Sequence, residues 1–337
     1  MAFTSIAGVK VCGIAAAVPS TVKHNSEIGG EADRAYVGKL SQQVGVLERR
    51  VVAAGQQGSD LAVAAARSVL AGLNWDPSTI DLLIVATQTP DRLFPGISFT
   101  LHRHLGLPQA TPVFDVNLGC SAFTHGLWMA SSLLAGVGKR ALLINVDTMS
   151  RTLGATDWGS QVLFGDAGTA TALEIDPSAS VINAVMTSDG KGTEAVCYPD
   201  SAMSASMDRA PAFVINGPAV LGLALRSVPR LLADILDHTG LKLDHIGLIV
   251  PHQANIFILD KLVERLHMQA SRVVLSMGRF GNTSSASIPL ALCASRQQVA
   301  AANRRHTLMV GFGTGFSLSA VHADLSATMF FDPVEVS

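Results

Sequence analysis

Three short segments of the chain contain residue types that together could do thioester chemistry. Cys120 lies in the string GCSA, His252 in PHQAN and Asn282 in GNTSSAS. A cysteine thiolate accepts an acyl group from another thioester at little thermodynamic cost, and two neutral donors can hold the enolate oxygen formed when a malonyl thioester loses carbon dioxide. The three residues therefore indicate carbon–carbon bond formation on thioesters.

Each of these residues also has a structural interpretation when it is taken singly. Cys120 could be a buried cysteine at a junction between a strand and a helix, and His252 a packed core histidine. Asn282 could belong to a plain turn before a helix cap. The string PHQAN is specific, and the presence of all three motifs favours the catalytic interpretation.

The local pattern around Cys120 predicts how its thiol is presented. Residues 115–118 resemble a strand that leads into a tight turn at Gly119, and residues 121–134 predict a helix that buries Phe123 and Leu127. Cys120 would then stand at a helix N-terminus, whose unpaired N–H groups and positive dipole lower the pKa of a thiol from about 8.5. We expect a reactive thiolate there. His252 follows a buried strand, so its ring is expected to project into a cleft.

The elements that must position these residues follow from an internal repeat. The string LIVATQ at residues 83–88 matches LIVPHQ at residues 248–253. The same alternation of helices and buried strands occurs twice along the chain, which implies two α/β halves packed on each other. The expected strands cover 82–86, 141–146, 246–250 and 308–310, and the expected helices include 60–73 and 220–238.

We place the boundary between the halves near residue 175. Residues 1–175 then carry the nucleophilic Cys120, and residues 176–337 carry His252 and Asn282. A pseudo-twofold relation would bring the three side chains together at the junction. Residues 190–212 are interpreted as a surface excursion or a cap over the site.

Composition excludes several classes of protein. The chain of 337 residues is 48% hydrophobic and 15% charged, so it can bury a large core, and its net charge of −2 gives no basic field for nucleic acid. The first residues lack the pattern of a signal peptide, and no apolar run of about 18 residues exists. We expect a cytoplasmic protein that does not enter the membrane. The widely spaced cysteines indicate neither a zinc site nor a disulfide framework; they are Cys12, Cys120, Cys197 and Cys293.

The motifs, in this order, resemble those of the condensing enzymes of the thiolase superfamily, most closely 3-oxoacyl-ACP synthase III. Further matching strings are LFP at 93–95, LFGDAG at 163–168 and ING at 215–217, so the resemblance covers nearly the whole chain. It implies a thiolase-like α/β fold of two pseudo-symmetric halves with buried sheets, layered α/β/α/β/α. It also implies a homodimer that acts in fatty acid or other lipid biosynthesis.

The resemblance also implies a mechanism. An acyl group from acyl-CoA or an acyl carrier protein would be loaded on Cys120 and condensed with malonyl-ACP, assisted by His252 and Asn282. No metal or redox cofactor is expected. The string GFGTGF at 311–316 lies too near the C-terminus for a dinucleotide site. In condensing enzymes this loop, here Gly313 and Thr314, offers an N–H to the acyl oxyanion together with the N–H of Cys120.

The sequence departs from the family pattern where substrates are held. The segment WIxxRTGI of the family aligns with residues 39–46, KLSQQVGV, so its tryptophan and arginine are missing. Trp158 replaces an arginine, Phe257 replaces another, and Gly222 replaces a lysine on the carrier-docking helix. We therefore expect a specialised paralogue, in secondary metabolism or a dedicated acyl pathway. The substrate-binding residues implied by the resemblance are Phe94, Asn216 and Phe312.

Two interpretations of the entrance remain open. In the first, Trp158 is a stacking platform for the adenine of coenzyme A and Lys39 is a phosphate partner. In the second, Trp158 is a packed surface aromatic and the donor is a carrier protein, docked by Arg226, Arg230, Lys261 and Arg265.

Two other functions also remain open. A cysteine hydrolase would need a base that activates water and usually a carboxylate or amide that orients the histidine. A non-catalytic partner subunit would not need all three residues of the triad. Release of carbon dioxide from a malonyl thioester distinguishes condensation from the hydrolase. The starter acyl group is not encoded in a recognisable motif.

Overall fold

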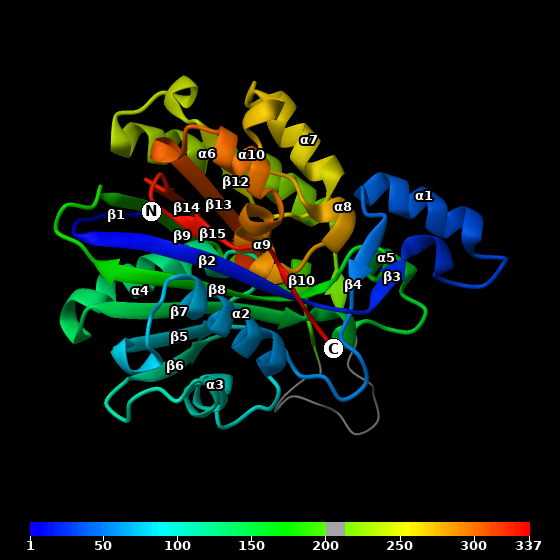
Figure 1. Ribbon diagram of the computed structural model, residues 1–337. Helices are drawn as coiled ribbons and strands as arrows, with labels where there is room; N and C mark the ends of the chain where they lie inside the picture. Colours follow the sequence, from blue (N-terminus) through cyan, green and yellow to red (C-terminus); the bar gives the residue numbers. More distant parts are fainter. Residues whose placement is uncertain (200–212) are drawn as a thin grey trace.

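The computed structural model describes residues 1–199 and 213–337, and within these ranges two large mixed sheets form the framework (Figure 1). The first sheet has the order β15-β2-β8-β7-β5-β6, and β16 also pairs with β2. Its strands are β15 (Met329–Phe330), β2 (Val9–Pro19), β8 (Asp166–Ile175), β7 (Arg140–Thr148), β5 (Leu82–Ala86), β6 (Val113–Val116) and β16 (Val334–Val336).

The second sheet repeats the pairing pattern of the first. Strand β5 is parallel to β7, which is antiparallel to β8, and strand β12 is parallel to β13, which is antiparallel to β14. The predicted pair of pseudo-symmetric α/β halves is thus confirmed, with the repeated strings on β5 and β12. The strands of the second sheet, in order, are β1 (Ala2–Ile6), β9 (Ile182–Ser188), β14 (Ser317–Ala323), β13 (Thr307–Gly313) and β12 (Leu248–Pro251).

The proposed boundary near residue 175 falls between β8 and β9. Each sheet also takes a strand from the opposite end of the chain. Strand β1 pairs with β9 in the second sheet, while β15 and β16 pair with β2 in the first. We keep the division into residues 1–175 and 176–337 as a proposal, in which the N-terminal strand joins the second half and the C-terminal strands join the first.

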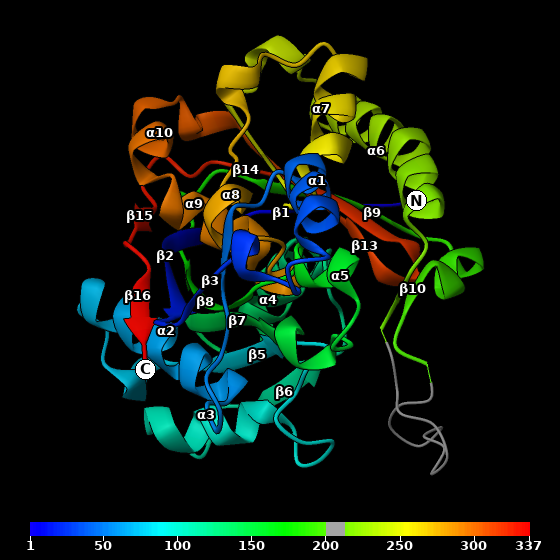
Figure 2. The same cartoon turned by 90° about the vertical axis from the view of Figure 1, so that its right-hand side faces the viewer.

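Helices form the other three layers (Figures 1 and 2). Between the sheets, α4 and α9 contribute apolar side chains to one core with the inner faces of both sheets, since Phe123, Leu127 and Ile288 are fully buried there. Two outer clusters join helices to the outer faces of the first and second sheets. The layering α/β/α/β/α is therefore confirmed. The helices are α4 (Ala122–Val137) and α9 (Ser287–Ala294) inside, α2 (Gly58–Gly72) and α3 (Ile97–Leu105) on the first sheet, and α6 (Gly217–Thr239) and α7 (Ile256–Arg265) on the second.

Smaller elements surround the region where the halves meet. Within residues 190–199, a 3-10 helix (Gly190–Ala195) precedes strand β10, which pairs with β11. The remainder of the predicted cap, residues 200–212, lies outside the described residues. The other elements used below are β3 (Val22–His24), β4 (Glu48–Arg50), α1 (Arg34–Val44), α5 (Trp158–Gln161), β10 (Val196–Cys197), β11 (Val214–Ile215), α8 (Met277–Phe280) and α10 (Arg296–Ala301).

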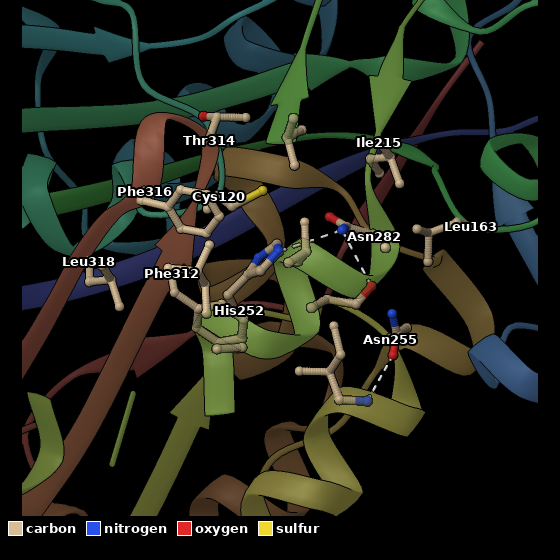
Figure 3. Close-up of a pocket in the computed structure, with 18 of the residues that line it drawn as sticks. Cys120, Leu163, Ile215, His252, Asn255, Asn282, Phe312, Thr314, Phe316 and Leu318 are labelled. Carbon is tan, nitrogen blue, oxygen red and sulfur yellow. Dashed lines mark hydrogen bonds between the residues drawn. The ribbon is translucent and has the colours of Figure 1, made fainter. Parts of the chain in front are cut away.

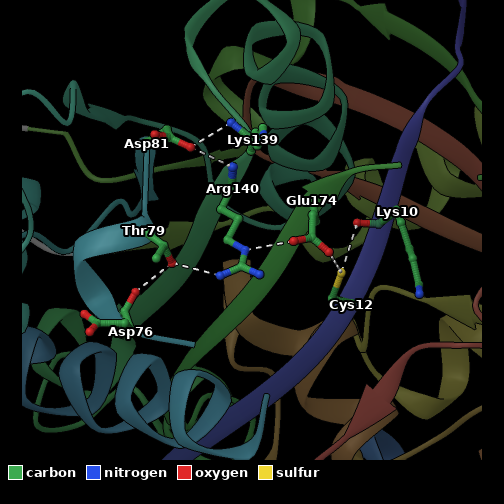
Figure 4. Close-up of polar contacts among 8 residues, drawn as sticks. All are labelled: Lys10, Cys12, Asp76, Thr79, Asp81, Lys139, Arg140 and Glu174. Atoms are coloured by element: carbon green, nitrogen blue, oxygen red, sulfur yellow. Dashed lines mark hydrogen bonds and ion pairs between the residues drawn. The ribbon is translucent and has the colours of Figure 1, made fainter. Parts of the chain in front are cut away.

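Polar contacts secure the first sheet at the start of β7 (Figure 4). Arg140 donates to Glu174 of β8 at 2.8 Å and to Thr79 at 3.0 Å. The Cys12 thiol lies 4.0 Å from Glu174, and burial, then the Glu174 charge, raises its pKa to about 11. At about 3.3 Å per residue, the opposite end of β7, which carries Asp147, is roughly 23 Å away. Cys12 is thus a structural thiol remote from that end.

Candidate active site

One cavity holds Cys120, His252 and Asn282 (Figure 3). Its volume is about 110 Å³, and it lies where the carboxyl ends of β12 and β13 meet the start of α4. The structure therefore brings together three residues that are distant in the sequence. Apolar side chains form most of the remaining wall, including Leu163, Ile215, Phe312, Phe316 and Leu318.

His252 is held from three sides. It directly follows β12, and its backbone N–H donates to the carbonyl of Val310 at 2.8 Å. The imidazole Nδ1 lies 2.7 Å from the hydroxyl of Ser287, and the ring packs edge to face on Phe312 with 5.4 Å between centroids. The side chain is 2% exposed, and this burial lowers the pKa of His252 to about 3. The imidazole is therefore neutral at any physiological pH.

Asn282 has its amide orientation fixed by the backbone. The preceding Gly281 has φ +66°, a left-handed conformation that favours glycine, and turns the chain out of α8. The side-chain Oδ1 of Asn282 accepts from the N–H of Ser284 at 2.9 Å. Its Nδ2 consequently points toward Nε2 of His252 at 3.5 Å and the carbonyl of Ala254 at 3.4 Å. The histidine and the amide thus face the cavity side by side.

The predicted lowering of the Cys120 pKa is contradicted by the surroundings of the thiol. Burial raises the pKa of the Cys120 thiol to about 12, and the charge of Asp147 raises it further. The Ser284 side chain and the N–H groups of Cys120 and Thr314 lower the pKa, by less. Loss of hydration in an apolar cavity outweighs the partial charge of a helix end, and neutral His252 supplies no cation. The pKa of the Cys120 thiol is thus shifted upward, although the residue keeps part of its surface accessible in the cavity.

The glycine loop approaches the nucleophile closely. A Cβ added to Gly313 would lie 2.3 Å from the Cβ of Cys120, so only glycine fits there. Thr314 donates from its hydroxyl to the Gln88 side chain at 3.2 Å. The left-handed positions of the loop are Gly315, with φ +65°, and Phe316, with φ +44°, so threonine is compatible with the backbone at 314.

A second cavity lies beyond Thr314. Its volume is about 530 Å³, and it shares Thr314 and Val196 with the cavity that holds Cys120. Space is therefore available on both sides of the loop. Polar and apolar side chains line it together, including Gln88, Asn117, Met149, Arg151 and Phe213.

Other predicted substrate residues have different positions. Phe312 lines the cavity, whereas Asn216 caps α6 by accepting from the N–H of Ala219 at 3.1 Å. Phe94 is 82% exposed and Lys39 is exposed on α1. Trp158 is half-buried against the small cluster that includes Val37 and Val162. Among the described residues, the wall of the Cys120 cavity includes none of Phe94, Lys39, Trp158 and Asn216.

Sequence reasoning missed some residues of the site. Asn255 lines the cavity and caps α7 by accepting from the N–H of Ile258 at 2.8 Å. Fully buried Asp147 accepts from the N–H groups of Gln88 at 2.8 Å and Ser285 at 3.0 Å, so it ties the Gln88 loop to the Asn282 loop. Asn255 is the last residue of the string PHQAN, which could have identified it. Asp147 stands outside the motifs, and only the fold reveals its role.

Two further findings concern cofactors and membranes. In the described ranges, no three or more His, Cys, Asp and Glu side chains gather as a metal ion would require. Nor does any helix of that part of the chain combine the length and apolar character needed to cross a membrane.

Comparisons with known proteins agree with this geometry. The models for 3-oxoacyl-[acyl-carrier-protein] synthase III and for its C-terminal part match residues 114–190 and 236–325. A beta-ketoacyl-[acyl-carrier-protein] synthase III of Neisseria gonorrhoeae is 31% identical over 313 residues, which are 93% of this chain and 98% of the relative.

Solved structures show the same fold. The 3-oxoacyl-(acyl-carrier protein) synthase of Burkholderia xenovorans superposes with a TM-score of 0.93 at 31% identity and 99% coverage of both chains. The priming beta-ketosynthase of the R1128 polyketide pathway gives a TM-score of 0.84 at 27% identity, covering 97% of this chain and 98% of the other. Fold and site thus define a thiolase-fold condensing enzyme. This chain belongs to the 3-oxoacyl-ACP synthase III family.

Proposed function

We propose that this enzyme loads an acyl group from a thioester donor on Cys120 and condenses it with malonyl-ACP to give a 3-oxoacyl thioester and carbon dioxide. The main support for this proposal is that Cys120, His252 and Asn282 line one apolar cavity. The relatives named as synthases of this type, which align over nearly the whole chain, support it.

The first half-reaction is acyl transfer to the thiol. The Sγ of Cys120 bonds to the donor carbonyl carbon, and the donor sulfur leaves with the proton that Cys120 gives up. The backbone N–H groups of Cys120 and Thr314 lower the pKa of the thiol by hydrogen bonding. The same N–H groups would donate to the oxyanion of the tetrahedral intermediate. This assignment uses backbone donors, so it needs no particular side chain at position 314.

The second half-reaction is decarboxylative condensation. The bond between the malonyl carboxylate and its methylene carbon breaks, and the electron pair forms an enolate whose oxygen faces His252 and Asn282. The neutral imidazole and the amide can donate hydrogen bonds to that oxygen. The apolar wall disfavours the bound carboxylate. The enolate carbon then attacks the acyl carbonyl, and Cys120 leaves as a thiolate that regains a proton from water.

One experiment tests both half-reactions. The protein is incubated with a panel of acyl-CoA donors, its intact mass is measured, and labelled malonyl-ACP is then added to the loaded enzyme. We expect a mass increase of one acyl group, followed by release of labelled carbon dioxide and loss of the adduct. An adduct that is released to water at the same rate with and without malonyl-ACP would overturn the proposal.

The partner of His252 argues against a hydrolase. A Cys–His hydrolase usually orients its histidine with a carboxylate or an amide. Here Nδ1 of His252 meets the hydroxyl of Ser287, and the pKa lowered to about 3 makes the imidazole a poor base for activating water. A neutral donor suits enolate stabilisation, so the arrangement supports condensation.

The proposed carrier-docking surface consists of Arg226, Arg230, Lys261 and Arg265. These cations are exposed on α6 and α7, the helices whose first turns border the cavity through Val220 and Ile258. Lys261 also pairs with Glu264 at 2.8 Å. Arg226→Glu with Arg230→Glu should raise the KM for malonyl-ACP and leave the KM for a small acyl-CoA unchanged. Equal changes in both constants would reject this surface.

The proposal includes a homodimer in the cytoplasm. Leu93, Phe94 and Phe99 form an exposed apolar stretch, with 63%, 82% and 57% of their surfaces accessible, which a second copy of the chain would cover. Light scattering after size exclusion should give twice the chain mass, and Phe94→Asp should give the single-chain mass.

A specialised role is part of the same proposal. Phe257, which replaces a family arginine, is 42% exposed beside the cavity wall at the start of α7, and Lys39 stands where the family pattern has its tryptophan. A priming ketosynthase of a polyketide pathway is among the structural relatives. We propose a dedicated acyl pathway, and the adduct masses from the donor panel would name the starter.

A further inference from the structure

Ser287 is the residue that fixes one side of the His252 ring. It is the first residue of α9, between the two sheets, and it is 1% exposed. In the part of the chain that the structure describes, the hydrogen-bond partner of its hydroxyl is Nδ1 of His252 at 2.7 Å. A serine hydroxyl has a single proton to donate, and a buried donor left without an acceptor costs about 1–3 kcal/mol.

Two hydrogen arrangements fit the positions of the heavy atoms. With the proton on Nδ1, Ser287 would accept from His252, and the serine proton would be left without an acceptor. With Nδ1 unprotonated, Ser287 donates to it and the imidazole proton lies on Nε2. The first arrangement would gain a bond from Nδ2 of Asn282 to Nε2, but 3.5 Å is long for an N–H donor.

We propose that Ser287 is a positioning residue that holds His252 as the tautomer with its proton on Nε2. The Nε2–H of His252 and the Nδ2–H of Asn282 are then two donors, 3.5 Å apart, that cannot bond to each other and both face the cavity. Together they form a site for one negatively charged oxygen. With respect to catalysis the inference rests on the proposed function, in which that oxygen belongs to the enolate of the malonyl group.

The two half-reactions depend on Ser287 to different extents. Acyl transfer uses the N–H group of Cys120, at the start of α4, and the N–H group of Thr314, in the glycine loop. Decarboxylation uses the Nε2–H that the tautomer provides. Loss of the serine hydroxyl should therefore slow release of carbon dioxide and affect acylation much less. A residue with only a packing role would change both half-reactions together.

The test combines three variants with a spectroscopic measurement. Ser287→Ala removes the hydroxyl, and Ser287→Thr retains it. Ser131→Ala is the matched control, because Ser131 is a fully buried helical serine of α4 whose hydroxyl has no partner among the described residues. Nitrogen-15 NMR of histidine-labelled free enzyme reports which ring nitrogen carries the proton, and a His252→Gln sample identifies the His252 signals among those of the 10 histidines.

We expect the wild-type signals to show a protonated Nε2 and an unprotonated Nδ1. Ser287→Ala should give a mixture of tautomers and release carbon dioxide about 10-fold or more slowly, with acylation within about 3-fold of wild type. Ser287→Thr should restore the Nε2–H tautomer, and Ser131→Ala should match the wild type. A wild-type His252 with its proton on Nδ1 would overturn the inference, as would an unchanged tautomer and rate in Ser287→Ala.

The NMR result separates this inference from the proposed function. It is measured on the free protein and needs neither donor nor acceptor. An enzyme that shows the Nε2–H tautomer but releases no carbon dioxide would refute the proposed function while retaining the role of Ser287. If Ser287→Ala does not fold, the wild-type tautomer still decides the assignment.

Discussion

The floor of the cavity, formed by His252 and Asn282, and its predicted entrance at Lys39 and Trp158 are built in opposite ways. On the floor, His252 and Asn282 are 2% and 5% exposed, and their polar atoms contact Ser287, Ser284 and Ala254 at distances between 2.7 and 3.4 Å. Of the two residues predicted to form the entrance, Lys39 is exposed on α1, and Trp158 packs only partly against a small apolar cluster.

The difference indicates where this family member can vary. A floor residue shares its contacts with two or three others inside the core, so a substitution there leaves buried polar groups unpaired and costs about 1–3 kcal/mol for each. A substitution at Lys39 exchanges one solvated side chain for another, and one at Trp158 removes only part of a small apolar contact. The proposed catalytic residues can thus be retained while the predicted donor-binding groups change, which agrees with the proposed specialised paralogue. The predictions below test this contrast.

Removal of the nucleophile should have the largest effect. Cys120→Ala should abolish the acyl adduct, because no other described thiol lines the cavity that holds His252 and Asn282. Intact-protein mass after incubation with the acyl-CoA panel measures it. Cys12→Ala is the control, since Cys12 is also buried with a raised pKa and should be dispensable. An adduct that persists in Cys120→Ala and maps to Cys12, Cys197 or Cys293 would contradict the assignment.

Loss of either floor donor should have the next largest effect. His252→Ala and Asn282→Ala should retain acylation to some degree but lose malonyl decarboxylation by roughly 10²-fold or more, because each donor contributes a few kcal/mol to the enolate. The half-reactions are followed by adduct mass and by labelled carbon dioxide. His102→Ala on α3 is a matched histidine control on the outer face of the first sheet. An equal loss of both half-reactions would refute this division of roles.

The pH dependence should distinguish the two half-reactions. Because the pKa of Cys120 is raised to about 12, the thiolate fraction grows with pH, and alkylation of Cys120 should rise about tenfold per pH unit between pH 7 and 9. His252, with its pKa lowered to about 3, stays neutral throughout, so decarboxylation by acylated enzyme should show no inflection near pH 6.5. A plateau of alkylation below pH 8 would show that a thiolate exists at rest.

The entrance should give the smallest effect. Trp158 packs beside Val37 and Val162, which favours the packed-aromatic interpretation over the adenine platform. Trp158→Ala should therefore change the KM for acyl-CoA by less than about 3-fold and lower the thermal stability modestly. Stacking worth about 1–3 kcal/mol would instead raise KM by about 5- to 150-fold. The same acyl group delivered from coenzyme A and from a carrier protein gives the comparison, and a selective rise for coenzyme A would restore the platform.

Much of the fold and of the triad could be predicted from local patterns. The strand at 82–86 was predicted with the observed bounds, and the helix predicted at 121–134 extends over Ala122–Val137. Buried runs of β-branched and leucine residues and 3.6-residue periodicity are properties of neighbouring residues, so they are visible in the sequence. The motifs GCSA, PHQAN and GNTSSAS named the three residues because the chemistry needs those residue types.

The pKa of Cys120 and the hydrogen-bond partner of His252 were decided by the tertiary structure alone. The sequence placed Cys120 at the start of a helix, and from this a lowered pKa was inferred. The walls that desolvate the thiol come from segments as distant as Leu163, Ile215 and Phe312, and their combined effect has the opposite sign. The contact between Ser287 and His252 likewise joins residues 35 positions apart. Residue types specify which reactions are available, whereas pKa values and tautomers depend on solvation and on partners that only the packed chain brings together.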